Sequence, residues 1–216
     1  MSKALGIIDV QRGFMPAEEG TNLNELGFGE LAVPDGELVV PPANRLLAAF
    51  AGHGLLTFTS QDWHPAQTAH FSTHPDFVNN WPVHCVANSP GAELHPGLKV
   101  LPDTVAFKKG IDALLKDQKD TSYSAYFSWD KDNRTLPDVL SRRGITEVTL
   151  GGLALDYCVG KTAIDLKTRI PHMEVTVAID ATKGITDEAS EHMLEDFKNF
   201  GIQTKSTDQI IAELEA

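Results

Sequence analysis

Short apolar segments alternate with amphipathic segments along most of this 216-residue sequence. The apolar segments have the length of strands, and the amphipathic ones carry the proline and glycine signals of helix starts and ends. The apolar runs are nearly continuous, as is typical of strands that are covered on both faces. Strands separated by helices predict a parallel sheet with right-handed crossovers. We therefore expect one α/β domain over residues 1–216: a three-layer, doubly wound, mostly parallel sheet with helices on both faces.

The pattern also predicts where the elements lie. The expected strands cover 4–8, 55–60, 104–108, 147–153 and 174–179, and the expected helices cover 42–52, 134–144, 159–168 and 187–200. Residues 15–40 and 62–103 interrupt the alternation, and we expect a long loop in the first and a metal-binding loop region in the second. Loops longer than about 12–15 residues in compact domains are usually functional or disordered.

Polar residues stand where four of the predicted strands end. Asp9 follows the first strand, Asp62 the second, Lys109 the third and Cys158 the fourth. Ligands of open α/β sheets bind beyond the carboxyl ends of the strands. These four side chains are therefore predicted to converge at one edge of the sheet.

The region after the second strand has the composition of a metal site. It holds Asp62, His64, His70 and His84, and such a set suits zinc, iron or manganese better than calcium or magnesium. Asp62 and His64 are two residues apart, so they face the same side of an extended segment. The alternative is a loop with surface histidines. Cys85 is not expected to be a ligand, because it points away from its neighbour His84 in an extended chain.

Cys158 lies where a strand meets a helix. A helix N-terminus favours a thiolate, and its free N–H groups can hold an oxyanion. The alternative is an inert buried cysteine, which is the more common case for this residue type. Asp9 is either a turn former or, if buried beside the thiol, a proton acceptor. Lys108 and Lys109 point to opposite faces of a strand, so only one of them can reach the site.

Charge and composition restrict the partners. The formal net charge of -12 argues against nucleic acid and against an anionic membrane surface. No stretch approaches the ~18 apolar residues of a membrane span. The apolar run at the N-terminus is too short for a signal peptide, and the two cysteines do not form a secreted framework. We expect a cytoplasmic protein with reduced thiols, and a homo-oligomer is compatible with the sequence.

A series of motifs, in order across nearly the whole chain, resembles the nicotinamidases (pyrazinamidases) of the isochorismatase-like cysteine hydrolase family. The motifs are Ile8-Asp9-Val10-Gln11 with Phe14, Asp62-Trp63-His64-Pro65 with His70, Trp81-Pro82 with His84-Cys85, Phe107-Lys108-Lys109-Gly110, Tyr123-Ser124-Ala125-Tyr126, and Gly152 to Ala163 around Cys158.

The resemblance implies a role for several residues. Asp9, Lys109 and Cys158 would be catalytic, and Lys109 is favoured over Lys108 because the lysine of relatives directly precedes a glycine. The backbone N–H groups of Ala154 and Cys158 would form the oxyanion hole. The bond between Ala154 and Leu155 would be cis, and Leu155 stands where many relatives have threonine.

The resemblance also implies a metal and a substrate. One divalent ion, zinc first with iron or manganese as alternatives, would be held by Asp62, His64, His84 and His70, although relatives vary in whether the last position contacts the ion. The small-molecule substrate would be nicotinamide, bound by three aromatic side chains: Phe14, Trp81 and Tyr123.

The implied reaction converts nicotinamide to nicotinate and ammonia through a thioester, in NAD salvage. Two other functions are alternatives. A related cysteine amidohydrolase of carbamoyl or ureido compounds would need no metal, which the residues from Asp62 to His84 argue against. A non-catalytic metal-binding or scaffold protein would lack one of Asp9, Lys109 or Cys158.

Overall fold

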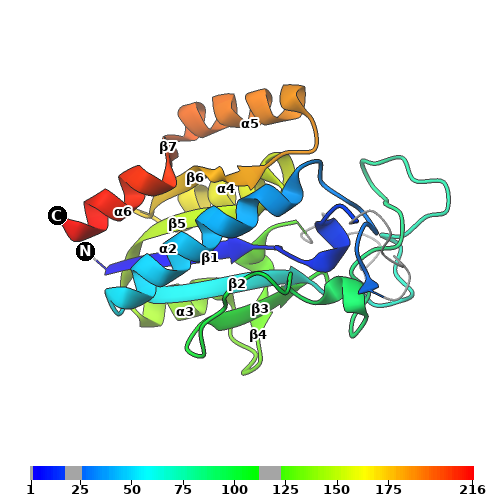
Figure 1. Cartoon of the computed structure of the whole chain (residues 1–216), viewed down its shortest axis with the longest axis horizontal. Coiled ribbons are helices and arrows are strands. Elements are labelled where there is room, and N and C mark those ends of the chain that lie inside the picture. The colour runs from blue at the N-terminus through cyan, green and yellow to red at the C-terminus, as the bar shows by residue number, and fades with distance from the viewer. Residues whose placement is uncertain (1, 18–25, 112–122) are drawn as a thin grey trace.

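The computed structural model describes residues 2–17, 26–111 and 123–216. Within these residues seven strands form one sheet (Figure 1). The strands are β1 (Ser2–Ile8), β2 (Leu56–Asp62), β3 (Val105–Lys109), β4 (Trp129–Asp130), β5 (Ile145–Leu153), β6 (Glu174–Lys183) and β7 (Gln203–Lys205). Their order in the sheet is β4-β3-β2-β1-β5-β6-β7. All neighbours are parallel except β3 and β4, which are antiparallel.

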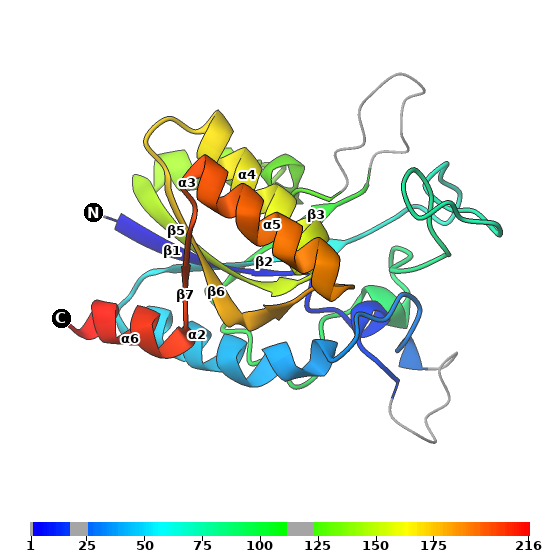
Figure 2. The same cartoon turned by 90° about the horizontal axis from the view of Figure 1, so that it is seen from above.

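Helices cover both faces of the sheet. The helices are α2 (Val40–Gly52), α3 (Leu136–Arg142), α4 (Gly160–Arg169), α5 (Asp187–Phe200) and α6 (Thr207–Glu215). Figure 2 shows α2 and α6 on one face and α3, α4 and α5 on the other. The predicted three-layer, mostly parallel α/β fold is therefore confirmed.

The apolar pattern of α2 explains how a helix attaches to this sheet. Its buried side chains recur every three or four residues, which places them on one face. They are Val40, Ala43, Leu46, Leu47 and Phe50. This face packs on β1 and β2. Full burial of one large apolar side chain contributes about 1.5–3 kcal/mol, so the helix is held mainly by packing.

The structure departs from the predicted elements in a few places. The expected loop over 15–40 ends early, because a 3-10 helix covers Gly36–Val39 and α2 already begins at Val40. The structure adds β4, β7 and α6, none of which was predicted. No helix in the described ranges is both long enough and apolar enough to cross a membrane.

The ends of the parallel strands position the site. Asp62 is the last residue of β2 and Lys109 the last of β3, and the two are paired in register. Asp9 and Ala154 directly follow β1 and β5. In Figure 1 these carboxyl ends point to the right, where the loops of the 62–103 region lie.

Candidate active site

Three buried side chains meet at the end of the sheet: Asp9, Lys109 and Cys158. The ammonium Nζ of Lys109 lies 2.8 Å from Asp9 Oδ2 and 3.4 Å from Cys158 Sγ. On the other side of the carboxylate, the hydroxyl of Ser60 donates to Asp9 Oδ1 at 2.7 Å. The nucleophile and the acid–base group predicted from the sequence are therefore brought together with one cation between them.

The backbone around Asp9 turns sharply to place its carboxylate. Asp9 has a φ of 49°, in the left-handed region that few residues other than glycine adopt. Its N–H still donates to the carbonyl of Ser60 on β2, at 3.1 Å. The chain thus turns away at the end of β1 and places the carboxylate between Ser60 and Lys109.

Cys158 lies in a widened turn between β5 and α4. The turn is π-helical over Leu155–Val159, a geometry that is frequent at functional sites. At the end of β5, a Cβ on Gly152 would lie 2.0 Å from the carbonyl oxygen of Ile8, so glycine lets β5 approach β1 closely. The cis peptide bond joins Leu153 to Ala154, so the expected cis bond between Ala154 and Leu155 was wrong by one residue.

Burial sets the direction of the pKa shift for Asp9 and for Cys158. It raises the pKa of Asp9, and Lys109 offsets only part of this effect. It also raises the pKa of Cys158 well above the usual range, and Lys109 lowers that pKa by less. The cysteine therefore rests as a thiol at neutral pH, contrary to the thiolate expected at a helix N-terminus. Lys109 remains an ammonium, because Asp62 and Asp9 outweigh the effect of its burial on the pKa.

The two neighbouring lysines point in opposite directions, as expected within a strand. The ammonium of Lys108 lies over the ring of Trp63, 3.1 Å from its centroid. Lys109 points inward and forms a second ion pair with Asp62. Burial raises the pKa of Asp62, but Lys109 and then His64 lower it by more, so the pKa lies well below the usual range. Asp62 is therefore a carboxylate at all ordinary pH values.

Three histidines lie beside Asp62. His64, His70 and His84 each offer one ring nitrogen, and these three nitrogens lie within 4.8 Å of one another. Asp62 Oδ2 is 3.6 Å from His64 Nε2 and 4.0 Å from His84 Nε2. The structure thus brings together all four residues of the predicted metal site.

The state of these rings fits a divalent metal ion. His84 Nδ1 lies 2.7 Å from the carbonyl oxygen of Pro82, so it carries the proton and leaves the lone pair on Nε2. Burial lowers the pKa of His84 to about 4, which keeps the ring neutral. His64 Nε2 is buried without a hydrogen-bond partner among the described residues. Neutral imidazoles beside a carboxylate are ligands that zinc, iron and manganese accept.

Gln11 holds the metal-binding segment in place. Its side-chain oxygen accepts from the N–H of Asp62 at 2.8 Å, and its side-chain nitrogen donates to the carbonyl of Asp62 at 2.9 Å. The same nitrogen donates to the carbonyl of Ala92, also at 2.9 Å. Gln11 belongs to the first motif of the sequence, but its role depends on these long-range contacts and was not predicted.

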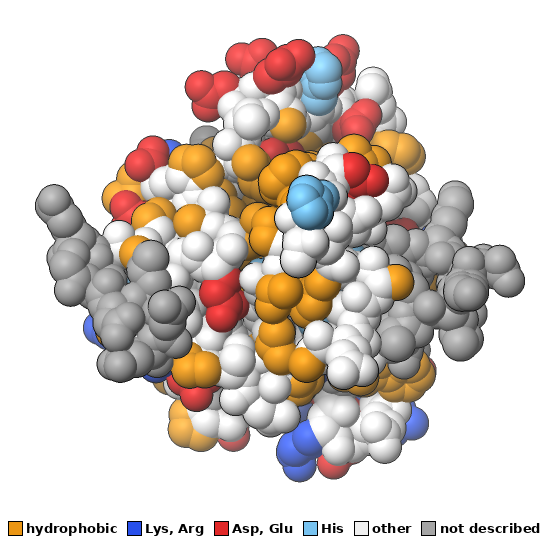
Figure 3. All heavy atoms as spheres, turned by 90° about the vertical axis from the view of Figure 1, so that its right-hand side faces the viewer, with side chains coloured by type: hydrophobic (Ala, Val, Ile, Leu, Met, Phe, Trp, Pro, Cys, Tyr) orange, Lys and Arg blue, Asp and Glu red, His pale blue; other side chains and the backbone are white. Residues whose placement is uncertain are grey.

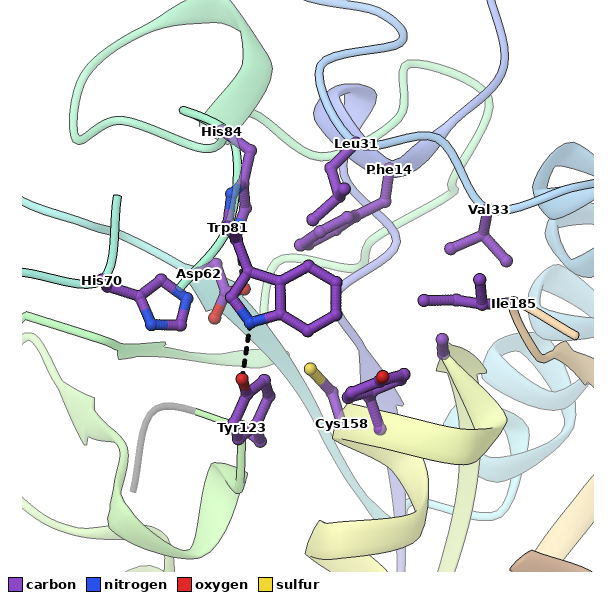
Figure 4. Close-up of a pocket in the computed structure, with 12 residues that line it drawn as sticks. Phe14, Leu31, Val33, Asp62, His70, Trp81, His84, Tyr123, Cys158 and Ile185 are labelled. Atoms are coloured by element: carbon purple, nitrogen blue, oxygen red, sulfur yellow. Dashed lines mark hydrogen bonds and ion pairs between the residues drawn. The ribbon is translucent and has the colours of Figure 1, made fainter. Parts of the chain in front are cut away.

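A pocket connects the thiol with the histidines (Figure 4). The three aromatic residues predicted to bind substrate line it, and the indole N–H of Trp81 donates to the hydroxyl of Tyr123 at 2.6 Å. Figure 4 shows Phe14 on the other side of the indole from His70. Figure 3 shows that hydrophobic side chains gather near the centre of this face of the molecule.

Four residues of the pocket wall were not predicted: Leu31, Val33, Tyr157 and Ile185. Leu31 and Val33 come from the 15–40 segment, which therefore contributes to the pocket and does not only cover the surface. Tyr157 packs edge-on against Trp81, with 5.2 Å between ring centroids. The position of Tyr157 beside Cys158 and that of Ile185 shortly after β6 could have indicated these two residues, whereas no signal in the sequence indicated Leu31 or Val33.

Known proteins are similar to this chain in sequence and in fold. An isochorismatase domain model matches residues 3–209. The Escherichia coli (strain K12) nicotinamidase is 34% identical, over 85% of this chain and 84% of its own length. The structure of a Pyrococcus horikoshii pyrazinamidase in complex with zinc superposes with a TM-score of 0.76, at 32% identity over 95% of this chain and 99% of that one. The structure of PnC1 from L. infantum in complex with nicotinate superposes with a TM-score of 0.77, at 28% identity over 96% and 93% of the two chains. The resemblance seen in the sequence is thus confirmed, and the chain belongs to the isochorismatase family.

Proposed function

We propose that the protein is a nicotinamidase, which hydrolyses the carboxamide of nicotinamide to nicotinate and ammonia, as a step of NAD salvage. One observation carries this proposal: a buried Asp9–Lys109–Cys158 cluster faces a group of three buried histidines across an apolar pocket. The thiol supplies the nucleophile that attacks the amide. The histidines would hold a metal ion that orients the nitrogen-containing ring of the substrate. The relatives named nicotinamidase or pyrazinamidase support the same substrate class.

Asp9 is the proton acceptor of the first step. The Cys158 thiol transfers its proton to the Asp9 carboxylate as the sulfur attacks the carboxamide carbon. The backbone N–H groups of Ala154 and Cys158 receive the charge that develops on the oxygen. Asp9 then gives the proton to the departing nitrogen, ammonia leaves, and a thioester on Cys158 remains.

The second half of the reaction uses the same carboxylate. A water molecule gives a proton to Asp9 as its oxygen attacks the thioester carbon. The C–S bond breaks, the proton on Asp9 returns to the sulfur, and nicotinic acid leaves and gives up its remaining proton to solvent as nicotinate. Lys109 stays charged throughout and stabilises each anionic state of Asp9 and Cys158, from which it lies 2.8 Å and 3.4 Å.

Asp62, His64 and His84 would hold a divalent ion, with His70 as a further ligand. When bound, such an ion orients a pyridine substrate as a Lewis acid. We propose zinc, since three imidazoles and one carboxylate suit it and a related pyrazinamidase binds it; iron and manganese are the alternatives. The low pKa of His84, about 4, keeps that ring available as a ligand at neutral pH.

The aromatic residues shape the pocket for a flat ring. Phe14 and Trp81 would contact the faces or edges of the pyridine and exclude water from the thiol. Tyr123 would act by fixing the indole of Trp81 through their hydrogen bond. Leu31 and Val33 close the pocket with aliphatic groups.

The experiment is ammonia release by the purified, metal-loaded protein, measured with nicotinamide and with a carbamoyl compound in parallel. We expect turnover of nicotinamide only, and its loss in Cys158→Ala and after removal of the metal with a chelator. Turnover of the carbamoyl compound alone would replace this proposal with the carbamoyl amidohydrolase. Turnover of nicotinamide by Cys158→Ala would refute the thioester route.

A further inference from the structure

The carboxylate of Glu30 lies inside the loops that build the site, at a distance from the reacting groups. Its Oε2 accepts the backbone N–H of Cys85 at 2.7 Å. The side chain is about half-buried, and burial raises its pKa while the bond from Cys85 lowers it by less. No cation pairs with Glu30 in the part of the chain that the structure describes. Partial burial of a carboxylate without a cation costs free energy, so the position of Glu30 requires an explanation.

Two glycines make room for this carboxylate. A Cβ on Gly91 would lie 2.0 Å from Glu30 Oε2, and a Cβ on Gly13 would lie 2.9 Å from the same atom. Any larger residue at position 91 would displace the carboxylate. Gly13 comes from the segment that carries Phe14, and Gly91 comes from the 62–103 region. The space for the Glu30 carboxylate is therefore built from two separate parts of the chain.

The bond to Glu30 holds a backbone that is unfavourable by itself. Cys85 has a φ of 44°, in the left-handed region, where a non-glycine residue persists only if its surroundings hold it. The carbonyl of Cys85 accepts the N–H of His64 at 3.1 Å. The residue before Cys85 is His84. Fixing Cys85 therefore fixes two of the three histidines.

Glu30 is also tied to the wall of the pocket. Its neighbour Leu31 lines the pocket, and the N–H of Leu31 donates to the carbonyl of Gly13 at 2.8 Å. A single side chain thus joins the aliphatic wall of the pocket to the loop of the histidines.

We propose that Glu30 is a positioning residue, whose carboxylate fixes Cys85 and so aligns His84 and His64 for the metal ion. The inference rests on the proposed function in taking these histidines as metal ligands. Groups that support metal ligands through hydrogen bonds typically change metal affinity by about 10- to 100-fold when removed.

The test is Zn²⁺ binding by the full chain after metal removal, measured by competition with a chromophoric chelator. Glu30→Ala removes the acceptor and is expected to weaken Zn²⁺ binding by about 10- to 100-fold. Glu30→Gln keeps an oxygen at the same reach and should restore most of the affinity. Glu30→Asp keeps the charge but withdraws the oxygen, so it should resemble Glu30→Ala. Glu37→Ala is the matched control, since Glu37 is an exposed glutamate in the same segment.

The ranking of the variants by Zn²⁺ affinity decides the question. If Glu30→Ala does not fold, the comparison of Glu30→Gln with Glu30→Asp is sufficient. Wild-type affinity in Glu30→Ala, or affinity restored by aspartate and not by glutamine, would overturn the proposal. A wild type that binds no Zn²⁺ would overturn it as well. Normal Zn²⁺ affinity in the Glu30 variants with intact nicotinamide hydrolysis in the wild type would remove this inference alone. Zn²⁺ binding in the expected order without nicotinamide hydrolysis would remove only the proposed function.

Discussion

Asp62 and Lys109 lie opposite each other in register at the ends of two neighbouring parallel strands, and their side chains form a buried ion pair. This pair links the two halves of the site, because Lys109 also contacts Asp9 and Cys158 and Asp62 lies beside the histidines. One strand pairing thus sets the distance between the nucleophile and the metal ligands.

Replacing Lys109 by methionine should damage both stability and activity. Removing one partner of a buried ion pair costs about 3–5 kcal/mol, and here two carboxylates would be left without their cation. We expect the free energy of unfolding to fall by about that amount and kcat/KM to fall by at least about 100-fold. Urea unfolding and ammonia release measure the two effects.

Lys108→Met is the control for this prediction. Its ammonium lies over the ring of Trp63, away from the thiol, and a partly exposed cation–π contact contributes about 0.5–1 kcal/mol. We expect nearly normal turnover. The assignment of Lys109 fails if Lys108→Met is inactive and Lys109→Met is not.

Tyr123→Phe should impair substrate binding more than chemistry. The change leaves the buried indole N–H of Trp81 without its partner, which costs about 1–3 kcal/mol. We expect KM for nicotinamide to rise about 5- to 10-fold or more with a smaller change in kcat. Tyr126→Phe, in the same segment, serves as the control. A loss confined to kcat would instead place the Tyr123 hydroxyl in the chemical step.

The sequence was sufficient to predict five of the seven strands in the described residues, and which side chains meet at the ends of these strands. Apolar runs and glycine or proline signals are local, and they located β1, β2, β5 and β6 to within a few residues. The positions of Asp9, Asp62, Lys109 and Cys158 at strand ends predicted their convergence, since parallel strands all end at the same edge. Family motifs then singled out Lys109 from Lys108.

Other features depend on contacts that no local pattern encodes. Leu31 and Val33 reach the pocket from a segment without periodicity, and Ile185 reaches it from the loop after β6. The proton affinity of Cys158 was predicted in the wrong direction, because the effect of burial exceeds that of a nearby cation. The helix α6 was missed although Ser206 and Gln209 form a capping box at its start, which is a signal visible in the sequence.

The stability of the protein should depend on pH through Asp156. Its carboxylate accepts the N–H of Ile185 at 3.0 and 3.1 Å, and burial raises its pKa above the ordinary value of 3.8 by more than this bond lowers it. The folded state then holds the proton more tightly than the unfolded state. The stability that Asp156 contributes is therefore fully present below 3.8 and is lost as pH rises through the raised pKa.

Asp156→Asn tests this sign, since asparagine keeps an acceptor for Ile185 but cannot ionise. Urea unfolding of both proteins at a series of pH values gives the difference in the free energy of unfolding. We expect the wild type to lose stability relative to the variant as pH rises above 3.8, and then to level off. A difference that is constant, or that grows in favour of the wild type, would show that the pKa is not raised.

Metal removal should abolish turnover reversibly. We expect one Zn²⁺ per chain by elemental analysis, loss of activity on dialysis against a chelator, and recovery on addition of Zn²⁺. His84→Ala should weaken Zn²⁺ binding by more than about 100-fold, because removal of a group that only supports a ligand already costs up to about that much. His192→Ala, a change at an exposed histidine of α5, should leave it unchanged. Full activity of the stripped enzyme would remove the metal from the proposed function.

The most direct test of the account is to trap the acyl-enzyme. Metal-loaded protein is mixed with nicotinamide, quenched in acid within the first turnovers, and analysed by peptide mass spectrometry. We predict one nicotinoyl group on Cys158 and none on Cys85, the other buried cysteine of the chain. Turnover of nicotinamide without any acyl group on Cys158, or with the acyl group on Cys85, would contradict the central claim that the Asp9–Lys109–Cys158 cluster cleaves the amide.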